Sequence, residues 1–130
     1  MLLASLQTKR EQEAFLSLAH LVAKADGNFD YASAILIGMY QEEMGLEKAP
    51  AHLQGLPVSD LCRVFTDANS KHLVFLNLFS LAHVDGNSNM AKKSVLETIR
   101  QELAVSISEA KRLESEIKIV TASYYPSFTD

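Results

Sequence analysis

Two Asp-Gly-Asn tripeptides stand 59 positions apart in the chain, each directly after a run of apolar residues. Carboxylate and amide oxygens are the ligands that Ca²⁺ and Mg²⁺ prefer in proteins. The carboxylates of a divalent-cation site would come from Asp26 and Asp85, with Asp30 as a third. Amide oxygens would come from Asn28, Asn87 and Asn89. The only cofactor that the sequence suggests is therefore a divalent cation, Ca²⁺ or Mg²⁺.

The same tripeptides also have the form of a turn between two helices. Gly27 can take the left-handed conformation that ends many helices, and Asp30 is a good N-cap for the next one. Asn89 holds the equivalent place in the second copy, where it caps equally well without a charge. An EF-hand loop that starts at Asp26 would need glutamate at its twelfth position, which is Ile37. The conformational requirements of a turn explain most of the motif, and a cation site remains the alternative interpretation.

The register between the two copies continues well beyond the tripeptides. Ala23 matches Ala82, and Glu43 matches Glu102, at the same interval. Apolar residues also match, so that Leu36, Ile37, Tyr40 and Met44 meet Val95, Leu96, Ile99 and Leu103. We expect the first four of these residues, and Leu96, Ile99 and Leu103 in the second copy, to face inward. A repeat of this length indicates one supersecondary unit that is used twice.

Helical spacing of apolar residues runs through nearly the whole chain, and no segment alternates with the period of a strand. We expect helices over residues 8–25, 31–44, 59–65, about 67–84, 90–104 and 106–122, with the repeats joined by a Pro- and Gly-containing connector over 47–58. The stretch Val74–Phe79 is apolar nearly all round, which is typical of a central buried helix. The predicted fold is all-α, a pseudo-two-fold helical bundle of two Asp-Gly-linked hairpins plus accessory helices. It forms a single domain over residues 1–130.

The other reactive side chains lack the arrangements that catalysis requires. The four histidines, His20, His52, His72 and His83, form no His-x-x-x-His pair. Cys62 lies among apolar residues, and we expect it to be buried rather than nucleophilic. No nucleophile elbow or phosphate-binding loop is present. We therefore predict a protein that is not an enzyme.

Composition restricts the partners. A formal net charge of −4 argues against nucleic acid, and the Lys92-Lys93 pair is too short for a basic stripe. We expect both of these lysines on a solvated helix surface. No stretch approaches the ~18 apolar residues of a membrane span, and the single cysteine suits a reducing compartment. A cytoplasmic protein is expected.

An apolar helix, Ala-Asp-Gly and a second helix, repeated after a connector, resemble the TerB-like (tellurite-resistance) helical domain family. The matching segments are 25–45 and 84–104. The resemblance implies an all-α pseudo-two-fold fold, a cytoplasmic setting, a role in stress or toxic-anion response, and metal binding. Family members carry further acidic residues where this chain has Tyr31–Ser33 and Met90–Lys92. The metal-binding role therefore carries over only to Asp26 and Asp85, with Asp30 as a weaker third.

The expected function is a non-catalytic TerB-like module that contacts protein partners in a stress or tellurite-resistance-type system. A homo-oligomer is compatible with the sequence. The alternative is a divalent-cation-binding protein that uses the two Asp-Gly loops.

Overall fold

The computed structural model describes residues 3–6, 8–46, 55–84 and 89–124. Within these ranges the chain is helical and contains no strand, which confirms the predicted all-α class. A 3₁₀ turn, η1 (Leu3–Ser5), precedes the helices. These are α1 (Lys9–Ala23), α2 (Tyr31–Glu43), α3 (Val58–Cys62), α4 (Ala68–Ala82), α5 (Met90–Glu102) and α6 (Ile107–Tyr124). Asp85 and most of the predicted connector lie outside the described residues.

The bounds of four helices recur at the repeat interval. Both α1 and α4 have 15 residues, both α2 and α5 have 13, and each bound of the first pair lies 59 positions before its counterpart. The predicted caps are confirmed. The Oδ1 atom of Asp30 accepts a hydrogen bond from the Ser33 N–H at 2.7 Å, and that of Asn89 accepts one from the Lys92 N–H at 2.9 Å. Asp67 caps α4 in the same way.

The second helix of each pair is followed, two positions after its last residue, by a residue with positive φ. Gly45 has φ 72°, as expected for a glycine stop, but its counterpart Ala104 has φ 56°. The prediction that the helix continues to Ala104 was therefore wrong, since α5 ends at Glu102. The Arg100 guanidinium donates to the Val105 carbonyl at 2.7 Å and holds this turn closed.

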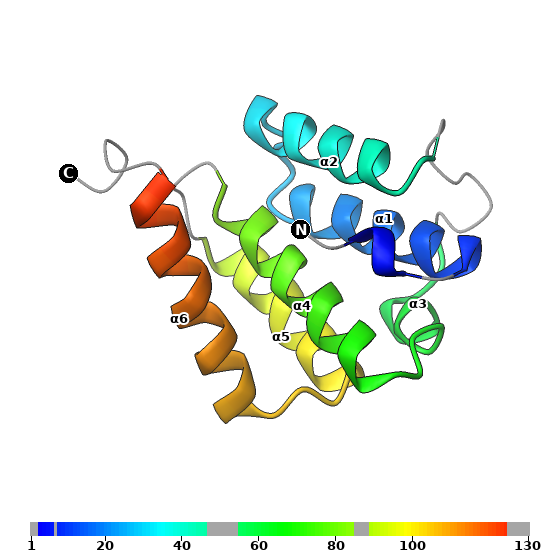
Figure 1. The fold of residues 1–130 in the computed structure, drawn as a ribbon. Coiled ribbons are helices and arrows are strands. Elements are labelled where there is room, and N and C mark those ends of the chain that lie inside the picture. The colour runs from blue at the N-terminus through cyan, green and yellow to red at the C-terminus, as the bar shows by residue number, and fades with distance from the viewer. Residues whose placement is uncertain (1–2, 7, 47–54, 85–88, 125–130) are drawn as a thin grey trace.

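The core lies where α1 packs against α4 (Figure 1). The α2 helix lies along α1 at one edge of the bundle, α5 lies along α4, and α6 covers another side of α4. The prediction that α4 is the central helix is confirmed, because Val74, Phe75, Leu78 and Phe79 are buried. The inward positions predicted for the first hairpin are also buried, except for the partly buried Leu36.

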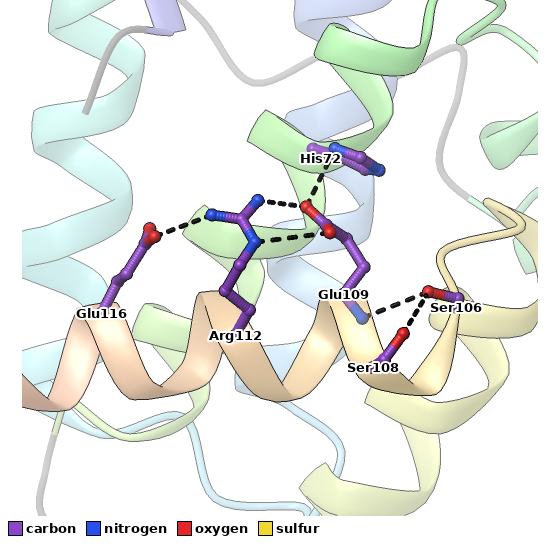
Figure 2. Close-up of polar contacts among 6 residues, drawn as sticks. All are labelled: His72, Ser106, Ser108, Glu109, Arg112 and Glu116. Atoms are coloured by element: carbon purple, nitrogen blue, oxygen red, sulfur yellow. Dashed lines mark hydrogen bonds and ion pairs between the residues drawn. The ribbon is translucent and has the colours of Figure 1, made fainter.

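A polar cluster joins α6 to α4 on the surface (Figure 2). The Glu109 carboxylate lies 3.5 Å from His72 Nδ1 and accepts hydrogen bonds from Arg112. The Arg112 hydrogen bond lowers the pKa of Glu109, so the carboxylate stays ionised in mild acid. Ser106 Oγ accepts from the Glu109 N–H at 3.1 Å, which confirms the predicted helix start there.

Tyr40 connects α2 to α4 through a buried hydrogen bond. Its hydroxyl donates to the Asn77 carbonyl at 2.9 Å, and its ring packs edge-on against Phe15 with centroids 5.3 Å apart. Burial raises the pKa of this hydroxyl, which therefore remains a donor at all moderate pH values.

We predict that Tyr40→Phe lowers the free energy of unfolding by about 1–2 kcal/mol, because it removes the donor to a buried carbonyl oxygen. Urea denaturation measures the change. Tyr31→Phe removes the same atom from a ring that is 81% exposed, and it should change stability by less than about 0.5 kcal/mol. Equal losses in the two variants would contradict the prediction.

Candidate functional site

The first Asp-Gly-Asn turn lies against the start of α5. The Oδ1 atom of Asp26 accepts from the Asn28 N–H at 3.0 Å, which shapes the turn itself. Its Oδ2 atom accepts from the Asn89 side-chain amide at 2.9 Å, across 63 positions of sequence. Gly27 takes the left-handed conformation expected from the sequence, with φ 78°. Asp26 therefore serves the turn and also ties the first hairpin to the cap of α5.

A buried ion pair lies beside this contact. The Nζ atom of Lys92 is 3.6 Å from Asp30 Oδ2, and the side chains are 1% and 23% exposed. One Asp30 oxygen thus caps α2 while the other faces the ammonium of α5. An ammonium removed from water is costly unless a carboxylate or other acceptors surround it. The pair consequently fixes the start of α5 against the start of α2.

The expectation that Lys92 and Lys93 both lie on a solvated surface was wrong for Lys92, which is buried, and is confirmed for Lys93, which is exposed. The signal was available in the sequence. Lys92 stands four positions before Leu96 and seven before Ile99, both of which were expected to face inward. Helical spacing therefore places its side chain on the buried face of α5. The usual preference of charged residues for the surface does not hold at this position.

The three residues proposed as cation ligands are distributed as follows. Asp26 and Asp30 share the α1–α2 turn and both accept structural hydrogen bonds, while Asp85 lies outside the described residues. Among the described residues, no group of three or more His, Cys, Asp or Glu side chains is arranged to hold a metal ion. The positive charge beside Asp30 is the Lys92 ammonium. A cation role for these residues stays a prediction.

The remaining candidate groups have structural surroundings. Cys62 is buried as predicted, and burial raises the pKa of its thiol to about 12, so the thiol is protonated at neutral pH. His83 Nδ1 lies 2.9 Å from the Phe79 carbonyl oxygen, and burial lowers the pKa of His20. His52 is outside the described residues. These contacts favour packing roles for His20 and His83.

A feature that the sequence reasoning missed is the outward face of α2. Tyr31, Ile35 and Met39 are 81%, 48% and 46% exposed, and they follow one another at single-turn spacing. Gly38 is also exposed and lies beside Ile35 and Met39 on this face. The sequence does contain a pattern that predicts this face. Apolar residues stand on more than one side of the 31–43 segment, and no charged residue occurs before Glu42.

The matching face of α5 is polar except at its first position, where Met90, the equivalent of Tyr31, is 79% exposed. The positions equivalent to Ala34, Ile35, Gly38 and Met39 hold Lys93, Ser94, Glu97 and Thr98, all of which are exposed. A helix at this position in the hairpin can thus fold with charged and hydroxyl side chains outward. Local folding does not require the apolar outward face of α2.

Comparison of the chain with protein-family models, with curated proteins and with solved structures found no match. Among the described helices, none is long and apolar enough to cross a membrane.

We predict that Asp30→Asn lowers the free energy of unfolding by about 1–3 kcal/mol, because it leaves the cap intact but removes the carboxylate charge from a buried ammonium. Asp67→Asn is the matched control, since Asp67 caps α4 at an exposed position. That variant should lose less than about 0.5 kcal/mol, because asparagine caps as well as aspartate. If chemical denaturation gave the two variants the same loss, the ion pair would not stabilise the fold.

Proposed function

We propose that the protein is a non-catalytic helical module that acts by binding another protein through the outward face of α2. The observation that carries this proposal is the exposed apolar stripe of Tyr31, Ile35 and Met39. Contiguous exposed apolar surface of this kind is typical of protein interaction sites. Scattered single apolar residues would not support the proposal, but these three share one helix face.

The second hairpin serves as an internal comparison for this proposal. We propose that the two hairpins are related by a pseudo-two-fold axis, which is supported by their equal helix lengths and equivalent caps. The contacts of Asp26 with Asn89 and of Asp30 with Lys92 support a common junction between the hairpins. The α1–α2 and α4–α5 hairpins would then fold under the same constraints and yet differ in their outward faces. We take that difference as support for a binding function of the α2 face.

The resemblance to TerB-like domains supplies the proposed setting. It rests on the two Asp-Gly turns and the helices around them. On this basis we place the module in a cytoplasmic stress or tellurite-resistance-type assembly. The interaction surface itself is argued from α2 and does not depend on that setting.

To test the binding function, we would convert the α2 face to its α5 counterpart with Ile35→Ser, Gly38→Glu and Met39→Thr together. The tagged wild-type protein should capture a partner from its source cell, and the triple variant should retain less than a tenth of it. Circular dichroism checks that the variant remains helical. Ser94→Ala with Thr98→Ala on α5 is the control and should capture normally. Undiminished capture by the triple variant would contradict the proposal.

The alternative function is divalent-cation binding by Asp26, Asp30 and Asp85. It is favoured only by the proximity of Asp26 to the other hairpin, since Asn89 donates its amide N–H to Asp26 and uses its oxygen to cap α5. It is disfavoured by Lys92, because a second cation beside Asp30 would meet the repulsion of the ammonium.

We predict no saturable heat when Ca²⁺ or Mg²⁺ is titrated calorimetrically into metal-free protein at millimolar concentration. Asp26→Asn serves as the comparison, since it preserves the hydrogen-bond acceptor of the turn but removes the charge. Saturable heat in the wild type that disappears in Asp26→Asn would favour the cation-binding alternative.

A further inference from the structure

Two buried residues, three positions apart, stand ahead of α1 and recur at the repeat interval ahead of α4. Leu3 and Leu6 are 0% and 1% exposed, and their counterparts Cys62 and Phe65 are both 2% exposed. The Leu6 N–H donates to the Leu3 carbonyl at 3.0 Å. The Phe65 N–H donates to the Cys62 carbonyl in the same way, at 3.2 Å. The repeated unit therefore includes a buried segment ahead of each hairpin.

Each of these segments fills a site between helices of both hairpins. The η1 turn packs against α2 and α4, whereas α3 packs against α5 and α1, which are the corresponding helices with the hairpins exchanged. A glutamate recurs at both sites. The Glu43 carboxylate accepts a hydrogen bond from the Leu3 N–H. Its counterpart Glu102 stands by Cys62, where its charge adds to the effect of burial in raising the pKa of the thiol. We call the place that η1 fills the α2–α4 site.

The contacts of η1 define the chemistry that the α2–α4 site accepts. The side chains of Leu3 and Leu6 are buried in it, while Ser5 between them is exposed. Glu43 accepts from the backbone N–H of the first leucine, and the Gln12 amide donates to the carbonyl of the second at 3.1 Å. Any segment with two leucines three positions apart offers the same apolar side chains and the same backbone groups. The site is thus built for a Leu-x-x-Leu segment.

The two buried segments differ in how firmly they are held. The segment ahead of α4 contains a five-residue α-helix and buries Leu61 as well as Cys62 and Phe65. The η1 element is a three-residue 3₁₀ turn, and its buried side chains among the described residues are Leu3 and Leu6. A 3₁₀ turn has poorer hydrogen-bond geometry than an α-helix, and less buried apolar area gives less stabilisation. Elements of low local stability open without global unfolding, so η1 should detach more readily than α3.

We propose that residues 3–6 are a displaceable internal ligand, and that the α2–α4 site binds a Leu-x-x-Leu segment of another protein in their place. The incoming segment would bury two leucine side chains, direct a backbone N–H to Glu43 and present a carbonyl to Gln12. This site differs from the outward face of α2, because α4 forms one of its walls. The inference therefore goes beyond the proposed function and does not depend on it.

The geometry favours another protein over a second copy of the chain as the source of the segment. A single residue of sequence separates Leu6 from Thr8, which caps α1. One residue spans at most about 3.5 Å, so residues 3–6 of one copy could enter the site of another only with α1 following directly behind them. A Leu-x-x-Leu segment in an exposed part of a different protein has no such restriction.

Binding in trans is tested with a fluorescent peptide of residues 1–8 as the probe. In the full chain, Leu6→Ser should vacate the site, because it places a hydroxyl where an apolar side chain is buried. The wild-type chain should bind the probe at least about tenfold more weakly than this variant, since its own segment occupies the site. A probe that carries Leu3→Ser and Leu6→Ser should not bind either protein.

The glutamates of the two sites provide a matched pair of variants. In the Leu6→Ser chain, the further change Glu43→Gln should weaken the probe several-fold, because a carboxylate accepts a stronger hydrogen bond than an amide oxygen does. Glu102→Gln is the control, since Glu102 belongs to the site that α3 fills, and it should leave the dissociation constant unchanged. Equal effects of the two changes would overturn the assignment of the probe to the α2–α4 site.

Hydrogen exchange tests displacement in the unaltered chain. The Leu6 amide should exchange at least about 100-fold faster than the Phe65 amide, its counterpart, because η1 opens locally while the segment ahead of α4 stays bound. Low concentrations of urea should leave the exchange rate of the Leu6 amide unchanged, as expected of a small local opening. Equal protection of the two amides would show that η1 does not detach, and would overturn the inference.

Two further outcomes would also overturn it. A Leu6→Ser chain that circular dichroism shows to be unfolded would make residues 3–6 an integral part of the core, and a folded variant that does not bind the probe would exclude a binding site. Dimerisation of the wild-type chain that Leu6→Ser abolishes would assign the α2–α4 site to a second copy instead of another protein. None of these results bears on capture through the outward face of α2, which the triple variant of that face tests separately.

Discussion

The burial of the Lys92 ammonium against Asp30 is the most demanding polar constraint on how the two hairpins join, beside the packing of α1 against α4. An ammonium that is 1% exposed requires acceptors in fixed positions, so α5 cannot shift relative to the first turn without a large loss of stabilisation. The Asp26–Asn89 hydrogen bond adds a second tie at the same place. Asp30 and Asn89 each act twice, because each caps its own helix and also contacts the other hairpin.

The features that the sequence predicted correctly are local. Caps such as Asp30 and Ser106 bind an N–H group three positions later, so their partners stand in the same short segment. Inward positions such as Tyr40 and Ile99 follow from helical spacing alone. Elements whose determinants lie within about one turn could therefore be placed before any coordinates were known.

The features that were missed have different causes. Nothing near Asp26 in sequence identifies Asn89 as its partner. The left-handed Ala104 was equally unforeseeable, since alanine favours helix and the turn is held by Arg100 from within the preceding helix. Lys92 differs from these two cases, because its spacing predicted burial and only the usual preference of charges for the surface opposed it.

The recurrence of helix bounds in the two hairpins is the reason for placing the proposed binding surface on an outer face. The junction between the hairpins and the α1–α4 core constrain the inward residues of both hairpins, and α2 and α5 have the same length and equivalent caps. Their outward residues are free of that constraint and differ in kind, with Gly38 where α5 has Glu97. A glutamate at that place pairs with Arg100 and suits water, whereas a glycine there weakens the helix for no internal benefit. The contrast between the two copies therefore lies on the side of α2 that faces away from the core, and it is there that the proposed interaction is placed.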